Sequence, residues 1–200
     1  MPVRRDSCAK EAINIIMGIN RAGECRVIDY NITPQESAEN YAEMLASFKE
    51  RGMKNVKLVI SDDLSGIDTA IDRTFPQAER QRCWIHVQRT LQNKVRRYEA
   101  AQLTHEFKEI RLQPTYELAA QKLNEFCTKW GKRYPSILRY AGMAPKLLTF
   151  MHFPIEFRRM IYTNNRLESM NKLLKMHSKK HEQFTSVDSL EKFLVPIFND

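Results

Sequence analysis

The stretch VKLVISDD, residues 56–63, is a short apolar run that ends in acidic side chains. Val56, Val59 and Ile60 are β-branched, which is typical of a strand in the centre of a sheet. Asp62 follows the run directly, so we expect its carboxylate at the carboxyl edge of that sheet, where α/β proteins bind ligands. A carboxylate there can hold a divalent metal ion such as Mg²⁺, which prefers oxygen ligands. The alternative is that residues 62–63 only cap the next helix.

Two further elements precede this strand. Residues 11–18 and 24–31 are apolar or alternating runs on either side of a turn-forming segment, so they predict a β-hairpin. A helix should follow, with Thr33 as its cap and Glu36 completing a capping box. We expect this helix to end at Gly52, because glycine commonly terminates helices.

The segments after Asp62 continue the alternation. A short helix with Ile67, Ala70 and Ile71 facing inward should precede a strand over residues 79–85. Short strands that alternate with helices predict an α/β fold with some parallel pairing.

From residue 87 onward the strand signals stop, and apolar residues recur at helical spacing. We therefore expect an all-helical insertion over residues 87–160. Two helices, over 164–177 and 187–198, should close the chain. The α/β core would then comprise residues 1–86 and be completed by residues 161–200.

The composition suits a basic globular protein. Lysine and arginine number 32 against 24 acidic residues, which gives a net charge of +8, and a polyanion such as nucleic acid is the usual partner of such a chain. No apolar run approaches the ~20 residues of a membrane span, and no signal-peptide pattern is present. The four cysteines are scattered, so we expect reduced thiols and a cytoplasmic protein.

Glu168 is a second candidate acid, at the edge of the apolar stripe of the helix over 164–177. One interpretation is an exposed ion pair with Lys172, four residues later, worth about 0.3–0.5 kcal/mol. The other is a metal-binding carboxylate flanked by lysines that meet phosphates.

Cys83 and His86 form a Cys-x2-His pattern with three interpretations. They could be half of a structural zinc site, completed by His177 and His181. They could instead end a strand near the carboxylates, with His86 approaching a phosphate. His86 could also be a packed histidine of the core.

Basic residues gather in several helical clusters, which suit phosphate contacts that supply affinity and register but not sequence readout. The clusters are Arg96 and Arg97; Lys129, Lys132 and Arg133; Arg158 and Arg159; and Lys172, Lys175, Lys179 and Lys180. The last cluster continues the helix of Glu168 and is the strongest candidate. Solvated helix faces are the alternative for all of them.

Several short motifs occur together and in order. They are residues 50–56, residues 60–62, residues 75–79, Cys83 with His86, and residues 162–171. In this combination the chain resembles the mutator-type transposases of bacterial insertion sequences, over nearly its whole length.

The resemblance implies a ribonuclease-H-like mixed sheet flanked by helices, with a helical insertion before the last catalytic acid. Such enzymes use an Asp-Asp-Glu triad and two Mg²⁺ or Mn²⁺ ions. Asp62 matches the second aspartate and Glu168 the glutamate. Cys83 and His86 match the family's supporting signature, and Asn165 matches its asparagine three residues before the glutamate.

The resemblance also implies a function, DNA transposition by phosphoryl transfer. The partners would be DNA, as element ends and target, and further copies of the chain in a homo-oligomer on DNA. No membrane and no small-molecule substrate would be involved, and the protein would work at the bacterial nucleoid. The alternative is a non-catalytic DNA-binding or oligomerisation remnant.

One feature departs from the family pattern. The first aspartate of the triad lies on a strand just before the segment that residues 2–5 resemble. We therefore expect an N-terminally truncated copy that lacks this first strand and is inactive alone.

Overall fold

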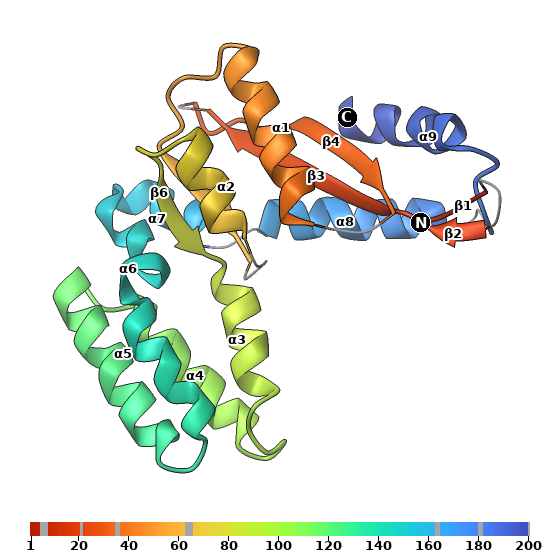
Figure 1. Ribbon diagram of the computed structural model, residues 1–200. Coiled ribbons are helices and arrows are strands. Elements are labelled where there is room, and N and C mark those ends of the chain that lie inside the picture. The colour runs from red at the N-terminus through yellow and green to blue at the C-terminus, as the bar shows by residue number, and fades with distance from the viewer. Residues whose placement is uncertain are drawn as a thin grey trace. The chain divides into compact units, whose positions relative to one another are not determined.

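The computed structural model describes residues 1–4, 8–20, 22–34, 37–62, 66–162, 165–179 and 182–199. Within this part of the chain the protein is a mixed α/β molecule (Figure 1). Two compact units are present. The first contains residues 1–55, 64–76 and 165–200, and the second contains residues 56–63 and 77–164.

Among its described residues, the first unit is built on short antiparallel strands and four helices. Its elements are β1 (Pro2–Arg4), β2 (Cys8–Lys10), β3 (Ala12–Ile19), β4 (Cys25–Thr33), α1 (Ala38–Glu50), α2 (Ile67–Thr74), α8 (Asn165–Ser178) and α9 (Val187–Asn199). The predicted hairpin is confirmed: β3 pairs with β4 from Ala12 opposite Thr33 to Ile19 opposite Cys25.

Helix α8 and helix α9 pack on this hairpin (Figure 1). Leu174 of α8 and Leu190 and Leu194 of α9 are buried with Ile15 of β3 in one apolar cluster. Leu167, Met170 and Leu174 of α8 are spaced three or four residues apart, as are Leu190 and Leu194 of α9, so each helix presents one apolar face to the core. This packing fixes α8, which carries Glu168.

Strand β1 was not predicted from the sequence. Pro2–Arg4 is extended and pairs with β2. Val3 is fully buried and forms a parallel bridge with Phe184. Its burial against the C-terminal part of the chain explains the extended conformation.

Helix α1 begins later than predicted. Ser37, not Thr33, is its N-cap: the Ser37 hydroxyl accepts a hydrogen bond from the amide of Asn40 at 3.2 Å. Thr33 instead ends β4, and its hydroxyl accepts hydrogen bonds from the side-chain amides of Asn14 and Asn40. Glu36 of the predicted capping box lies outside the described residues.

The end of α1 at Gly52 is confirmed. Gly52 has φ of +93°, and its amide donates to the carbonyl of Lys49 at 3.1 Å. The amide of Met53 donates to the carbonyl of Phe48 at 2.9 Å. These two bonds satisfy the last carbonyls of the helix, as in a Schellman motif.

In its described residues, the second unit joins two parallel strands to a helical segment. Its elements are β5 (Leu58–Ser61), β6 (Glu79–Arg82), α3 (Trp84–Gln92), α4 (Ala100–Arg111), α5 (Tyr116–Gly131), the 3-10 helices η1 (Pro135–Met143) and η2 (Thr149–His152), α6 (Ala144–Leu147) and α7 (Ile155–Ile161). The parallel pairing of β5 and β6 agrees with the sequence-based expectation.

The strand predicted over residues 79–85 is shorter than expected. It ends at Arg82, and Cys83 is the N-cap of α3. His86 therefore lies in a helix and not at a strand end. The reason is the helical spacing of Trp84, Val87 and Leu91, whose side chains are all buried in the core of the second unit.

Several aromatic side chains contact one another in that core. The ring centroid of Trp84 lies 4.4 Å from that of Phe107 in α4, and the centroids of Phe107 and Phe126 in α5 are 5.5 Å apart. The helices that carry these rings lie side by side (Figure 1). Every regular element within residues 87–160 is a helix, so the all-helical character predicted for this segment is confirmed.

The strands do not form one sheet in the described residues. They pair as three two-stranded sheets, β1–β2, β3–β4 and β5–β6. Residues Leu58–Ser61 are half-buried, so the central position expected for β5 is not met in this part of the structure. Among the helices described, none combines the length and the apolar character needed to cross a membrane.

Candidate catalytic and nucleic-acid-binding residues

Asp62 lies where the sequence predicts it, directly after β5. Its neighbour Ser61 is opposite Arg82, the last residue of β6, and the amide of Cys83 donates to the carbonyl of Ser61 at 2.9 Å. Asp62 and Cys83 therefore follow the ends of two paired parallel strands at the same edge. The second unit brings these two predicted site residues together.

Arg82 supports the backbone at this edge. Its guanidinium donates to the carbonyl oxygen of Asp62 at 2.5 Å, and the residue is only 8% exposed. Sequence reasoning missed Arg82. The one signal in the sequence is the position of this arginine in a short strand. A buried arginine is almost always paired, so an arginine there indicates a nearby acceptor.

Cys83 and His86 are close to each other at the start of α3. Cys83 is fully buried, and ligand atoms of the two side chains lie within 4.8 Å. The Nδ1 atom of His86 is buried and has no hydrogen-bond partner within the described part of the chain. Buried polar atoms normally have hydrogen-bond partners. His86 is therefore not the fully hydrogen-bonded core histidine of the third interpretation.

Glu168 lies in the first turn of α8, in the first unit. It is half-buried, at the edge of the face through which Leu167, Met170 and Leu174 contact the core. An acidic side chain in the first turn lies near the positive end of the helix dipole, which is a favourable electrostatic position. Asn165 is the first residue of the same helix.

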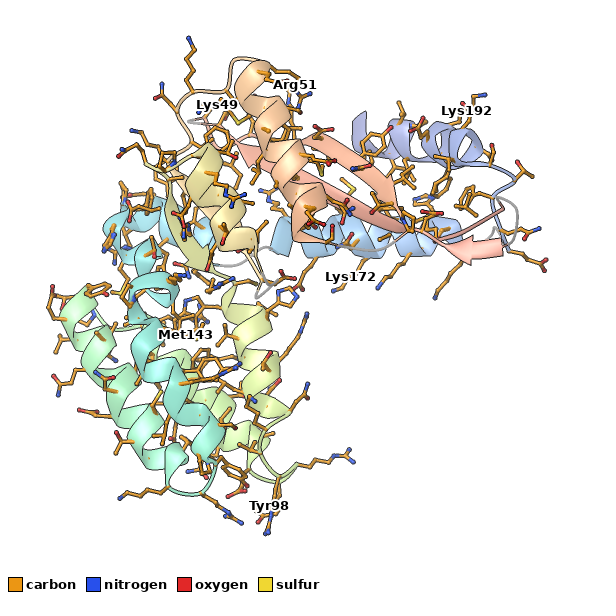
Figure 2. The ribbon with its side chains drawn as sticks, viewed as in Figure 1. Lys49, Arg51, Tyr98, Met143, Lys172 and Lys192 are labelled. Carbon is orange, nitrogen blue, oxygen red and sulfur yellow. The ribbon has the colours of Figure 1, made fainter. Side chains whose placement is uncertain are left out.

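The lysines that follow Glu168 face solvent. Lys172, Lys175 and Lys179 are exposed, and Figure 2 shows Lys172 pointing away from the body of α8. Lys180 lies outside the described residues, as does His181 of the predicted zinc set. The zinc interpretation stays a prediction.

Arg158 has structural partners. Its Nε donates to the carbonyl of Phe153 and its Nη2 to the carbonyl of Met151, both at 2.9 Å. The side chain joins α7 to η2 and is half-buried. Part of its donor capacity is thereby used within the protein. The side chain of Arg159 is not among those described.

The two units thus carry different parts of the predicted site. A parallel strand pair that places an acid at its carboxyl edge, followed by a helical segment, defines a mixed α/β protein with a candidate metal-binding acid. Residues 1–200 match the family model described as "Transposase, Mutator family" along their whole length. The chain belongs to the Mutator family of transposases.

Curated relatives agree with this membership. The chain is 34% identical over 200 residues to the transposase for insertion sequence element IS905 of Lactococcus lactis subsp. lactis (strain IL1403), covering 100% of this chain and 51% of that protein. It is 38% identical over 195 residues to the transposase for insertion sequence element IS1201 of Lactobacillus helveticus, covering 97% and 53% respectively. The chain spans about half the length of these relatives.

Proposed function

We propose that the chain is the catalytic part of a DNA transposase, which cuts the ends of an insertion element and joins them to target DNA. The observation that carries the proposal is the position of Asp62, directly after β5, in a chain that matches the Mutator family throughout. The relatives are named as transposases for insertion sequence elements, which supports DNA as the substrate. We further propose a ribonuclease-H-like arrangement of the α/β elements and a homo-oligomer on DNA.

Asp62 and Glu168 are the proposed metal ligands. Both offer carboxylate oxygens, which Mg²⁺ and Mn²⁺ prefer, so the donors fit these ions. When bound, such ions would activate water and stabilise the leaving oxygen of the phosphodiester.

The protein's own groups prepare these acids. The hydrogen bond from Arg82 to the carbonyl of Asp62 fixes the backbone that carries the Asp62 carboxylate. The first turn of α8 places Glu168 near the positive end of the helix dipole, a favourable position for an acidic side chain. We assign Cys83, His86 and Asn165 a supporting role, in which the unpartnered Nδ1 of His86 bonds to a group of the loaded site.

The exposed lysines of α8 are the proposed DNA contacts. Lys172 and Lys175 follow Glu168 on the same helix and Lys179 comes directly after its end, so they would hold phosphates beside the reacting strand. Lys180, Arg158 and Arg159 extend this proposal. Arg158 would contact phosphates through the guanidinium N–H donors that are not bonded to the carbonyls of Met151 and Phe153.

Binding of Mn²⁺ to the 200-residue chain, followed by electron paramagnetic resonance, tests the proposal. Removing a group that only orients a metal ligand lowers metal affinity by about 10- to 100-fold. Asp62→Asn and Glu168→Gln remove proposed ligands, so each should weaken Mn²⁺ binding at least as much. Asp188→Asn is the matched control, because this exposed carboxylate on α9 pairs with Lys192 and is not one of the proposed metal ligands. Variants that bind Mn²⁺ as tightly as the unchanged chain would overturn the assignment.

A further inference from the structure

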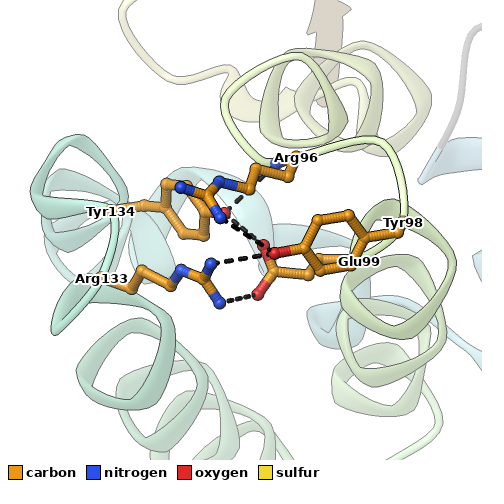
Figure 3. Close-up of polar contacts among 5 residues, drawn as sticks. All are labelled: Arg96, Tyr98, Glu99, Arg133 and Tyr134. Carbon is orange, nitrogen blue, oxygen red and sulfur yellow. Dashed lines mark hydrogen bonds and ion pairs between the residues drawn. The ribbon is translucent and has the colours of Figure 1, made fainter.

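Two loops of the second unit meet on a tyrosine (Figure 3). The guanidinium of Arg96, before α4, donates to the hydroxyl oxygen of Tyr98 at 3.1 Å. The guanidinium of Arg133, after α5, donates to the same oxygen at 3.0 Å. We call residues 93–99 and 132–134 the tip, and Figure 2 shows Tyr98 at this end of the helical segment.

The arginines of the tip are held in place. Arg133 also donates to the carboxylate of Glu99 at 2.5 Å, and the hydroxyl of Tyr134 bonds to the other oxygen of Glu99. The backbone amide of Arg96 donates to Tyr134 at 3.3 Å. The two guanidinium hydrogen bonds lower the pKa of Tyr98. The hydrogen bonds of Arg96 and Arg133 orient both side chains before any ligand binds, which lowers the entropic cost of binding.

Both arginines keep donors for a ligand. A guanidinium has five N–H donors, and these contacts use only some of them. The side chain of Arg133 is 49% exposed, and Arg96 is exposed as well. Tyr98 is 69% exposed, so the groups around its hydroxyl are open to solvent. The fork of a guanidinium matches the geometry of a phosphate group.

The surrounding sequence is strongly basic. Residues 89–100 and 128–140 contain eight basic residues and one acidic residue, Glu99. The basic residues are Arg89, Lys94, Arg96, Arg97, Lys129, Lys132, Arg133 and Arg139. Glu99 is already bonded to Arg133 and Tyr134. A polyanion is the ligand that this charge distribution favours.

We propose that the tip binds the phosphate backbone of DNA, as a contact surface additional to the lysines of α8. The choice of DNA among polyanions rests on the proposed transposase function. The contact would be independent of base sequence, because guanidinium groups on phosphates fix affinity and register but read no base edges. All residues of the tip belong to the second unit.

Fluorescence anisotropy with a labelled duplex of about 20 base pairs and arbitrary sequence tests the proposal between about 50 and 200 mM salt. The double variant Arg96→Ala/Arg133→Ala should bind about tenfold more weakly and lower the magnitude of the salt slope by about 2, one for each lost phosphate contact. The control Lys108→Ala/Lys122→Ala removes the same charge from exposed positions of α4 and α5 outside the tip. Equal losses in the two double variants would overturn the proposal.

A milder variant guards against a folding defect. Tyr98→Phe keeps the ring and removes only the oxygen that both arginines contact. It should keep the thermal midpoint of the unchanged chain and still weaken duplex binding severalfold. Unchanged affinity in this variant, together with an unfolded double variant, would refute the tip as a DNA contact.

Two parallel measurements separate the tip from the proposed function. Lys172→Ala/Lys175→Ala tests the α8 contact in the same assay. Loss in the tip variant alone supports the tip and refutes the α8 contact, and the reverse result refutes the tip. Tighter binding of polyglutamate than of the duplex would refute DNA as the occupant and assign the tip to an acidic protein.

Discussion

The side-chain amide of Gln81 donates to the carbonyl oxygen of Leu147 at 2.8 Å, across 66 positions of the chain. Its own carbonyl oxygen accepts from the amide of Phe150, also at 2.8 Å. Gln81 is 1% exposed, so these buried bonds join β6 to the segment of α6 and η2. The strand that leads to Cys83 is thereby fixed to the helical part of its unit.

Replacing Gln81 should be costly. Gln81→Leu leaves the amide of Phe150 buried without its acceptor and removes the 2.7 Å bond to the carbonyl of Arg82, while the carbonyl of Leu147 keeps its bond from Trp84 Nε1 at 2.8 Å. Leaving one such group unsatisfied costs about 1–3 kcal/mol, so the free energy of unfolding should fall by at least that amount. Urea denaturation followed by tryptophan fluorescence measures it. Gln121→Leu, at an exposed position of α5, is the control and should change stability by no more than about 0.5 kcal/mol.

Local patterns in the sequence were enough to predict most elements and the position of Asp62. The hairpin, the end of α1 at Gly52 and the helical segment after residue 87 depend on alternation, glycine and helical spacing, all of which are local. Asp62 follows an apolar run, which is also a local signal.

Partners distant in the sequence could not be predicted. The burial of Gln81 depends on Leu147 and Phe150, and nothing near residue 81 indicates them. Thr33 looked like a helix cap because its sequence context fits one, but its hydroxyl bonds to Asn14 across the hairpin. The pairing of Arg96 with Arg133 around Tyr98 is of the same kind.

A pair of glycine variants tests the backbone at the end of α1. Gly52 has φ of +93°, a conformation that costs an L-residue about 1 kcal/mol, so Gly52→Ala should lower the free energy of unfolding by about that amount. Gly142→Ala is the control: an added Cβ there meets no atom within 4 Å and the residue has no positive φ. Denaturant midpoints measure both, and equal effects at the two sites would contradict the conformational argument.

The cysteines should differ in reactivity. Burial in the core of the second unit raises the pKa of Cys127 to about 11, so at pH 8 only roughly one thiol in a thousand is ionised. Burial also raises the pKa of Cys25, but Arg166 opposes this effect and the residue is half-exposed. Iodoacetamide at pH 8 should therefore alkylate Cys25 before Cys127 in the folded chain. Peptide mass spectrometry reports the order, and urea should abolish the difference.

Glu106 should make stability depend on acid pH. Burial opposes ionisation of Glu106, but hydrogen bonds from Lys129, Trp130 and Gln102 outweigh it and lower the pKa below its usual 4.5. A carboxyl group with a lowered pKa in the folded state stabilises the fold above the unfolded pKa, and this stabilisation is lost as pH falls through the folded value. Glu106→Gln should therefore be less stable than the unchanged chain at pH 7, and the difference should shrink below about pH 4.5.

Urea denaturation at a series of pH values from 7 downward measures this difference for Glu106. Lys129→Gln should reproduce part of the effect, because its ammonium group lies 2.6 Å from the Glu106 carboxylate. The bond from Trp130 at 2.9 Å remains in that variant, so its pH dependence should lie between those of the other two chains. Parallel stability curves for Glu106→Gln and the unchanged chain through this range would show that these hydrogen bonds do not favour the ionised carboxylate.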